Sequence, residues 1–433
     1  MTSASTPALA RALGRYTLAA LVVNAILGSG IFGLPSVVAR LLGPLAPWAW
    51  VLGAVGNAVV LLCFAEVASR FSGAGGAYLY ARSSLPRLVA IQVGWLAFLT
   101  RLTAAAAAAN LFTVNLAGLA PWAAREDVRI ALLTALLGFL ALVNVRGVAE
   151  AGRLSNLFTV GKLLPLAVFL AAGALFLLTR EALPAVPAPL RTASGADWLQ
   201  AILLVVFAFG GYDGAMMAMG EARQPRRDAP FALIVGTVLL ALIYTGVQVV
   251  VGATLADPAA SERPLQDAAR VFLGAPGGVL LALGAIISVV GLLAANFLNA
   301  PRLGFALAEH LDLPPLFGRI HPRFHTPYVS ILTFGFLVWG LAVWGNFEWN
   351  ATLSSVSRLF VYGSTCVALV MLRRRQPGGA WLELPGGPVL AALGIAFCAL
   401  LAARMGRSEL VIVGLAAVVA FAHWLIARRL AAG

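Results

Sequence analysis

The chain has 433 residues, a length that in a soluble protein would suggest about three domains of roughly 150 residues each. The composition excludes that interpretation, because 61% of the residues are hydrophobic and 11% are charged, against about 25% charged in a typical soluble chain. A net charge of +13 would favour nucleic acid as a partner, but the basic residues form no stripe and have no interleaved aromatics. The sequence therefore predicts an integral membrane protein in contact with the lipid bilayer, and no nucleic-acid partner.

Twelve apolar segments are each long enough to cross a bilayer core of about 30 Å, which needs roughly 20 helical residues. We place them at residues 17–43, 46–68, 86–119, 128–146, 154–179, 197–220, 229–254, 276–300, 327–346, 349–372, 387–404 and 408–427. No removable signal is recognised before the first segment, and no connection is long enough for a soluble domain. In the longest outer connection, residues 264–270 are predicted to form a short amphipathic helix. The predicted fold is an all-α membrane protein with twelve transmembrane helices.

The arginine distribution predicts how these helices are oriented. The termini and the connections on their side hold 18 basic residues, the opposite connections hold 9, and three lie within spans. Basic residues are enriched on the cytoplasmic side of membrane proteins, so both termini are predicted to be cytoplasmic. The abundance of arginine and alanine hints at a GC-rich bacterial origin and therefore at the bacterial inner (plasma) membrane.

Two of the predicted spans contain glycine-rich interruptions. The first span contains GSGIFG at residues 28–33, and the sixth contains FGGYDG at residues 209–214. Backbone groups freed by a broken helix are costly in hydrocarbon unless they line a cavity or hold a ligand. Each run alone is equally compatible with close helix packing. Two matched breaks favour a binding site at the midplane of a transporter with inverted repeats.

The breaks predict a division of the chain into two halves. Residues 17–179 contain the first five helices and residues 197–372 the next five. Residues 1–16 form a cytoplasmic N-terminus, and residues 387–433 hold helices 11 and 12 and the cytoplasmic C-terminus. Each break then lies in the first helix of its half. There the N-terminus of a half-helix offers amides to a carboxylate, and unwound carbonyls accept from an ammonium.

A set of short motifs occurs in a characteristic order along nearly the whole chain. The motifs lie at residues 28–32, 66–71, 75–78, 144–147, 220–227, 300–302, 321–323 and 326–327. This set resembles the amino acid–polyamine–organocation (APC) permeases. The resemblance implies a five-plus-five inverted-repeat fold with broken helices 1 and 6, two further C-terminal helices, and transport of amino acids.

The resemblance also implies which residues bind the substrate, all of them at the two breaks. The predicted set is Ile26, Gly28, Ser29, Gly30, Ile31, Phe207, Phe209, Gly210, Gly211 and Tyr212. In relatives, the stretch matching residues 29–31 holds the substrate carboxylate with a hydroxyl and amides. The positions matching Ile26, Phe207 and Gly210 receive the α-ammonium on their carbonyls. The two aromatic residues of the set are candidate walls of the site, although aromatic residues in a membrane bundle more often simply pack.

Lys162 is the single lysine among 30 basic residues. It is predicted about 12 Å inside the fifth span at 1.5 Å per residue, where a charged side chain is costly. In some proton-coupled relatives, a fifth-helix lysine takes the place that sodium occupies in sodium-coupled members, and Ser288 on the eighth span is the expected neighbour. We hypothesise that protonation of Lys162 is the coupling event. The alternative is a fixed cation held by carbonyls of the broken helix, a role that arginine, which does not deprotonate in proteins, would also fill.

Three other ionisable residues lie within or beside the spans. Asp213 follows the second break and matches a position that is acidic in many relatives, where it is implicated in gating or pH response; pairing with an arginine is an equal alternative. Glu66, near the inner end of the second span, is predicted to be a structural ion pair or a loop anchor. Arg358, in the tenth span, is a candidate partner for an acid at a gate, and a helix end facing water is the simpler account.

The predicted function is the import of amino acids by alternating access, with the proton as coupling ion favoured over sodium symport or exchange. Neutral and apolar amino acids are favoured over cationic ones, because the predicted pocket has no obvious carboxylate besides Asp213. The three cysteines and four histidines lie far apart in the sequence, so no metal site, cofactor or enzymatic chemistry is predicted. An amino acid sensor with a transporter-like sequence remains an alternative, and nothing specifies a partner subunit.

Overall fold

The computed structural model describes residues 14–71, 76–147, 151–179, 193–212, 223–309 and 312–430, and within them the regular structure is helical. The α-helices are α1 (Arg15–Ile26), α2 (Gly30–Leu42), α3 (Ala46–Ala68), α4 (Gly76–Ser84), α5 (Arg87–Leu119), α6 (Glu126–Arg146), α7 (Ala151–Thr179), α8 (Gly195–Ala208), α10 (Pro225–Thr254), α11 (Pro264–Glu309), α12 (Tyr328–Trp344), α13 (Phe347–Arg375), α14 (Gly387–Ala402) and α15 (Arg407–Leu430). Three short 3₁₀ helices, η1 (Gly43–Leu45), η2 (Pro121–Ala124) and η3 (Pro315–Gly318), lie in connections.

Every predicted span coincides with helical structure. Eight described stretches are long and apolar enough to cross a membrane, and α1, α8, α12 and α14 are shorter apolar helices. The first predicted span is α1 and α2 together, and α8 is the described part of the sixth. The predicted all-α membrane fold is confirmed. Residues 1–13, and residues 213–222 that include Asp213, lie outside the described part.

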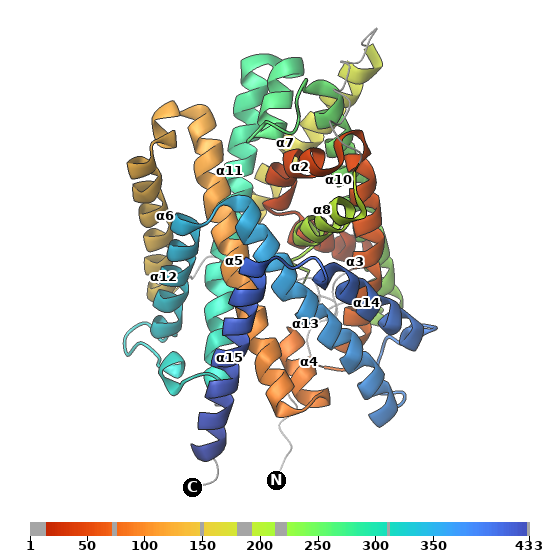
Figure 1. Cartoon of the computed structure of the whole chain (residues 1–433), viewed down its shortest axis with the longest axis vertical. Helices are drawn as coiled ribbons and strands as arrows, with labels where there is room; N and C mark the ends of the chain where they lie inside the picture. Colours follow the sequence, from red (N-terminus) through yellow and green to blue (C-terminus); the bar gives the residue numbers. More distant parts are fainter. Residues whose placement is uncertain are drawn as a thin grey trace.

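The helices pack as a bundle with α5 at its centre, against α11, α12, α13 and α15 (Figure 1). Small residues allow this close packing. The six alanines at residues 104–109 of α5 are all buried. A β-carbon added to Gly53 of α3 would overlap Val205 of α8, and one added to Gly284 of α11 would lie 2.7 Å from Pro165 of α7. These close approaches bring α8 against α3 and α11 against α7.

Buried ion pairs join distant segments at one end of the bundle. Arg373 of α13 donates to both carboxylate oxygens of Glu66 on α3, at 2.6 and 2.7 Å. The structural ion pair predicted for Glu66 is therefore confirmed. Asp312 is fully buried and accepts hydrogen bonds from Arg87 and Tyr78. Burial and the hydrogen bond to the Asp312 carboxylate raise the pKa of the Tyr78 phenol. These groups hold the bundle together away from the breaks.

Three segments that the sequence places on one side of the membrane lie toward one end of the molecule. Figure 1 shows α4, the connection from α11 to α12 and the C-terminal end of α15 toward the same lower end of the molecule. The sequence predicts all three on one side of the membrane. The short amphipathic helix expected at residues 264–270 is the first part of α11, whose helical geometry is interrupted at Gly274 (φ +68°). That prediction is also confirmed.

Candidate functional site

The first break separates α1 from α2. Helix α1 ends at Ile26, and α2 begins at Gly30 with Ser29 as its N-terminal cap residue. The chain leaves helical geometry at Leu27 (ψ 97°), so carbonyls in the last turn of α1 lose their helical partners. The helix is therefore interrupted where the glycine run predicts it.

The second break follows α8. This helix begins at a capping box between Ser194 and Asp197 and ends at Ala208, with Phe209 as its C-terminal cap residue. Gly211 has a φ of +103°, a conformation that glycine adopts without the steric cost other residues meet. A β-carbon there would also lie 2.8 Å from the Ala25 carbonyl oxygen. The end of α8 at Ala208 agrees with the start of the second predicted break, whose residues 213 and 214 lie outside the described part, and Gly211 contacts the first break.

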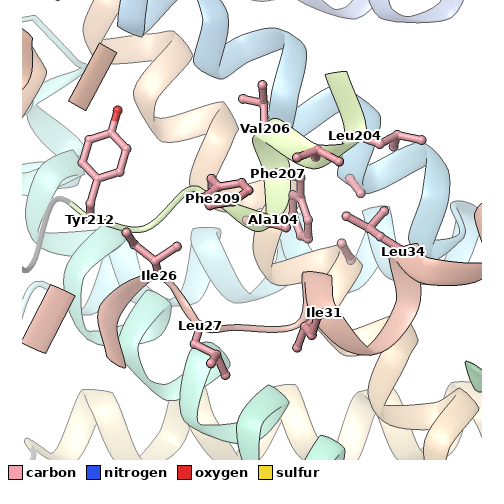
Figure 2. Close-up of a cluster of buried hydrophobic side chains, with 14 of the residues drawn as sticks. Ile26, Leu27, Ile31, Leu34, Ala104, Leu204, Val206, Phe207, Phe209 and Tyr212 are labelled. Carbon is pink, nitrogen blue, oxygen red and sulfur yellow. The ribbon is translucent and has the colours of Figure 1, made fainter. Parts of the chain in front are cut away.

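The two breaks face each other in the interior. Figure 2 shows the segment from Leu27 to Ile31 beside the segment from Phe207 to Tyr212. A β-carbon on Gly30 would lie 2.8 Å from Cα and Cβ of Ala208. Only a residue without a side chain permits this approach, which brings the start of α2 against the end of α8.

Lys162 of α7 lies at the first break. Its Nζ donates hydrogen bonds to the carbonyl oxygens of Asn24 at 2.6 Å and of Leu27 at 2.8 Å. The ammonium therefore satisfies carbonyls that the interrupted helix leaves without amide donors. Ser288 of α11 points its hydroxyl at the Gly28 carbonyl, 3.5 Å away. Lys162 and Ser288 thus both contact the first break.

The predicted carboxylate-binding stretch has unused hydrogen-bonding groups. The Ser29 hydroxyl is buried, with 1% of the residue exposed, and has no partner among the described residues. The amides of Gly30 and Ile31 have no helical acceptors because α2 starts there, whereas the Phe32 amide donates to the Ser29 carbonyl at 3.1 Å. A buried hydroxyl beside amides at a helix N-terminus provides donors for a carboxylate.

The carbonyls expected to receive the ammonium are partly engaged. The Ile26 carbonyl accepts from the Tyr244 hydroxyl at 3.4 Å. The Phe207 carbonyl accepts from the Gly210 amide at 3.2 Å and from Arg358 Nη1 at 3.3 Å. A substrate ammonium at the Phe207 carbonyl would therefore have the Arg358 guanidinium as its neighbour.

The two aromatic residues of the predicted set pack against other rings. Phe209 lies 5.1 Å from Tyr244 between ring centroids, and Tyr212 stacks on Tyr362 at 5.4 Å. Tyr212 also meets Phe64 edge to face at 5.3 Å. Both side chains are almost fully buried, so their observed contacts are those of packing residues around the second break.

The prediction that Arg358 belongs to a helix end facing water is wrong. The residue is only 8% exposed and lies about three turns inside α13. Its Nη1 is 3.4 Å from the Val206 carbonyl and 3.3 Å from that of Phe207. The sequence-based interpretation failed because these acceptors belong to a different helix, which α13 approaches only in the folded bundle.

Tyr244 of α10 is a further site residue that the sequence interpretation missed. Its hydroxyl lies 3.0 Å from the Ala208 carbonyl and 3.4 Å from the Ile26 carbonyl, so it contacts the ends of both interrupted helices. Gln248, one turn later, donates to the Pro35 carbonyl in α2. A signal for this pair was present, because two polar residues four apart share one face of an otherwise apolar helix.

A cavity of 780 Å³ lies beyond the breaks, at the ends of α5, α12 and α13. Its lining includes Asn110, Arg129, Trp344 and Phe347. The Phe347 ring also meets Phe207 edge to face, at 6.0 Å between centroids. Phe347 therefore stands between this cavity and the second break.

Helical spans, two facing breaks and basic side chains on the exposed carbonyls define a multi-span membrane protein built around interrupted helices. A family model described as amino acid permease matches residues 13–420. The chain belongs to the amino acid permease family and is a membrane transporter, not an enzyme.

Individual relatives match over most of their length. The chain is 26% identical to the branched-chain amino acid permease BcaP of Bacillus subtilis, covering 92% of this chain and 89% of that protein. It is 27% identical to the serine/threonine exchanger SteT of the same organism, covering 86% and 85% respectively. It is 26% identical to cationic amino acid transporter 4 of Mus musculus, covering 89% of this chain and 62% of that protein.

Proposed function

We propose that the protein imports amino acids together with protons, by alternating access around the two breaks. The observation that carries this proposal is the position of Lys162, whose Nζ bridges the carbonyls of Asn24 and Leu27 at the first break. Hydrogen bonds from a charged ammonium to carbonyls are stronger than those from a neutral amine. The bonds from Lys162 therefore weaken when it loses its proton. Loss of the proton therefore weakens the link between α1 and α7, which couples protonation to the geometry of the break.

Substrate binding is assigned to the predicted set at both breaks. The Ser29 hydroxyl and the first amides of α2 bind the carboxylate. The Ile26 carbonyl at the end of α1 binds the ammonium, because Arg358 already donates to the Phe207 carbonyl at the end of α8. The unpartnered hydroxyl supports the first assignment, since an unsatisfied buried polar group is costly. Both assignments concern groups common to all amino acids. The residues that surround the substrate side chain therefore determine which amino acid binds.

Neutral amino acids are the proposed substrates. The side chains of Ile31, Phe207 and Phe209 around the proposed site are apolar and buried. The names of two relatives refer to branched-chain amino acids and to serine and threonine. Cationic substrates are the second candidate, supported by the name of the mouse relative. Exchange instead of import is a second mode, supported by the name of SteT.

We further propose two five-helix repeats, residues 17–179 and 197–372, in a bacterial inner membrane with both termini cytoplasmic. The two breaks support the repeats, and the 18-to-9 arginine asymmetry supports the orientation. Reporter enzymes fused at the C-terminus test the orientation. Activity of a reporter that functions only in the periplasm would contradict it.

Uptake of radiolabelled amino acids by the purified protein in liposomes tests the function. An inward proton gradient should drive accumulation, and a sodium gradient at constant pH should have no effect. Robust accumulation driven by sodium would reject proton coupling. Exchange would appear as uptake that requires an amino acid inside the liposomes. Binding without any accumulation would identify a sensor.

A further inference from the structure

The Arg358 guanidinium penetrates the second break at a position that only glycine leaves open. A β-carbon built on Gly210 would overlap the Arg358 guanidinium. The guanidinium lies beside the Val206 and Phe207 carbonyls, to which Nη1 donates at 3.4 and 3.3 Å. Gly210 makes room for the arginine as well as breaking the helix.

Arg358 has hydrogen-bonding capacity that its observed contacts do not use. A guanidinium carries five N–H donors in a planar fork. Among the described residues, its hydrogen bonds run from Nη1 alone, to two carbonyls at 3.3 and 3.4 Å. No described carboxylate forms an ion pair with it. One turn earlier on α13, the Ser355 hydroxyl is fully buried and also lacks a partner.

We propose that Arg358 determines the charge specificity of the substrate site: its guanidinium pairs with a carboxylate on the substrate side chain and repels a side-chain cation. The substrate class is then amino acids with acidic or neutral side chains, with basic ones excluded. This inference rests on the proposed function, because it requires the substrate to bind at the breaks.

The charges at the two breaks support this selection. The described residues there contribute the Lys162 ammonium and the Arg358 guanidinium, and a zwitterionic substrate adds no net charge. At a separation of roughly 6 Å and an effective dielectric constant of about 20, one pair of unit charges changes binding by about 100-fold. Guanidinium is also suited to the task because its fork matches both oxygens of a carboxylate.

The first experiment uses the wild-type protein and three amino acids of nearly equal size: aspartate, asparagine and 2,4-diaminobutyrate. Each competes with the neutral amino acid that the transporter takes up best. Aspartate should compete at least as strongly as asparagine, and diaminobutyrate at least about 10-fold more weakly than asparagine. Equal competition by aspartate and diaminobutyrate would overturn the proposal. This arm does not depend on any variant folding.

The second experiment changes the side chain. Arg358→Gln should shrink the ratio between the affinities for aspartate and diaminobutyrate by about 10,000-fold, with about 100-fold from each substrate. Arg358→Lys should preserve the direction of this preference, and Arg358→Glu should reverse it. Arg302→Gln is the matched control, since it removes one guanidinium from an exposed position on α11 and should change nothing. A purely structural Arg358 would alter stability and the uptake of all substrates together.

The two levels of the proposal fail differently. If the wild-type protein transports no amino acid, the proposed function is wrong. If R358Q still takes up the neutral amino acid with unchanged preference between aspartate and diaminobutyrate, only the role of Arg358 is wrong. Thermal unfolding of R358Q in detergent is measured alongside. If the variant is as stable as the wild type, its substrate preference reports on the role of Arg358 and not on misfolding.

Discussion

The two breaks are alike in construction and different in the cation that each holds. In both, a helix stops in the interior and a basic side chain from another helix lies on the exposed carbonyls. At the first break the Lys162 ammonium is 2.6 and 2.8 Å from its acceptors. At the second the Arg358 guanidinium is 3.3 and 3.4 Å from its acceptors.

This difference matters because the two cations have different chemistry. An ammonium is a compact charge that can release its proton when buried, whereas a guanidinium stays charged and offers a fixed planar set of donors. On the proposed mechanism, the first break can change its hydrogen bonding during transport, and the second presents a constant charge to the substrate. The following predictions test this division, from the largest expected effect to the smallest.

Replacement of Lys162, the cation at the first break, should abolish proton coupling. In Lys162→Arg the charge remains but no proton is released, so accumulation driven by a pH gradient should be lost. Lys162→Ala should lose it too, because the Asn24 and Leu27 carbonyls lose their donor. Uptake in liposomes at several imposed pH gradients measures the effect. Full pH dependence in K162R would mean that Lys162 is only a fixed cation and that the breaks do not differ in this way.

A side chain at Gly30 should separate the two breaks. In Gly30→Ala the added methyl would lie 2.8 Å from Ala208, and overpacking of this kind costs about 1–3 kcal/mol, so substrate affinity should fall roughly 5- to 100-fold. Gly138→Ala on α6 is the matched control, because its methyl would meet no atom within 4 Å. Ligand-induced thermal shifts measure both variants. Equal affinity in G30A and G138A would show that the close approach is unimportant for binding.

A side chain at Gly211 should strain the backbone of the second break. Its β-carbon would also lie 2.8 Å from the Ala25 carbonyl oxygen of α1, but the Asn24 and Leu27 carbonyls that accept from Lys162 are not among its contacts. The positive φ of this residue is unfavourable for alanine, and such strain costs about 1–3 kcal/mol. Gly211→Ala should therefore lower stability and neutral amino acid uptake while leaving the response to pH gradients intact. Thermal unfolding together with uptake at two pH gradients tests this. A selective loss of the pH response would mean that coupling depends on the second break as well.

The smallest effect is expected at Tyr244, which touches both breaks. Tyr244→Phe removes the hydroxyl near the Ala208 and Ile26 carbonyls, at a cost of about 1 kcal/mol for one hydrogen bond. Stability and uptake should fall only a few-fold, and the charge preference should stay as in the wild type. Thermal unfolding and competition assays provide the measurement. A changed preference between acidic and basic substrates in Y244F would show that Arg358 alone does not set the charge preference at the second break.

Local chemistry explains which features were predictable. Two matched glycine runs favour interrupted helices, so the ends of α1 and α8 were correctly predicted, and apolar length located the spans. The position of Lys162 at the first break agrees with what the family resemblance implies. In contrast, Arg358 and Tyr244 were misjudged or missed because their acceptors lie 151 and 218 residues away. The partner of Glu66 was anticipated only as some ion pair, and its identity as Arg373 depended on the packing of α3 and α13.

The sequence by itself determined that this is a helical membrane protein, where its helices lie, and which two of them are interrupted. These properties follow from composition, apolar length and the backbone freedom of glycine, all of which act within one segment. Only the tertiary structure decided that the breaks face each other and that the second receives Arg358 from another helix. Those contacts depend on how closely α8, α11 and α13 approach their neighbours, and packing of small residues across helices controls that distance.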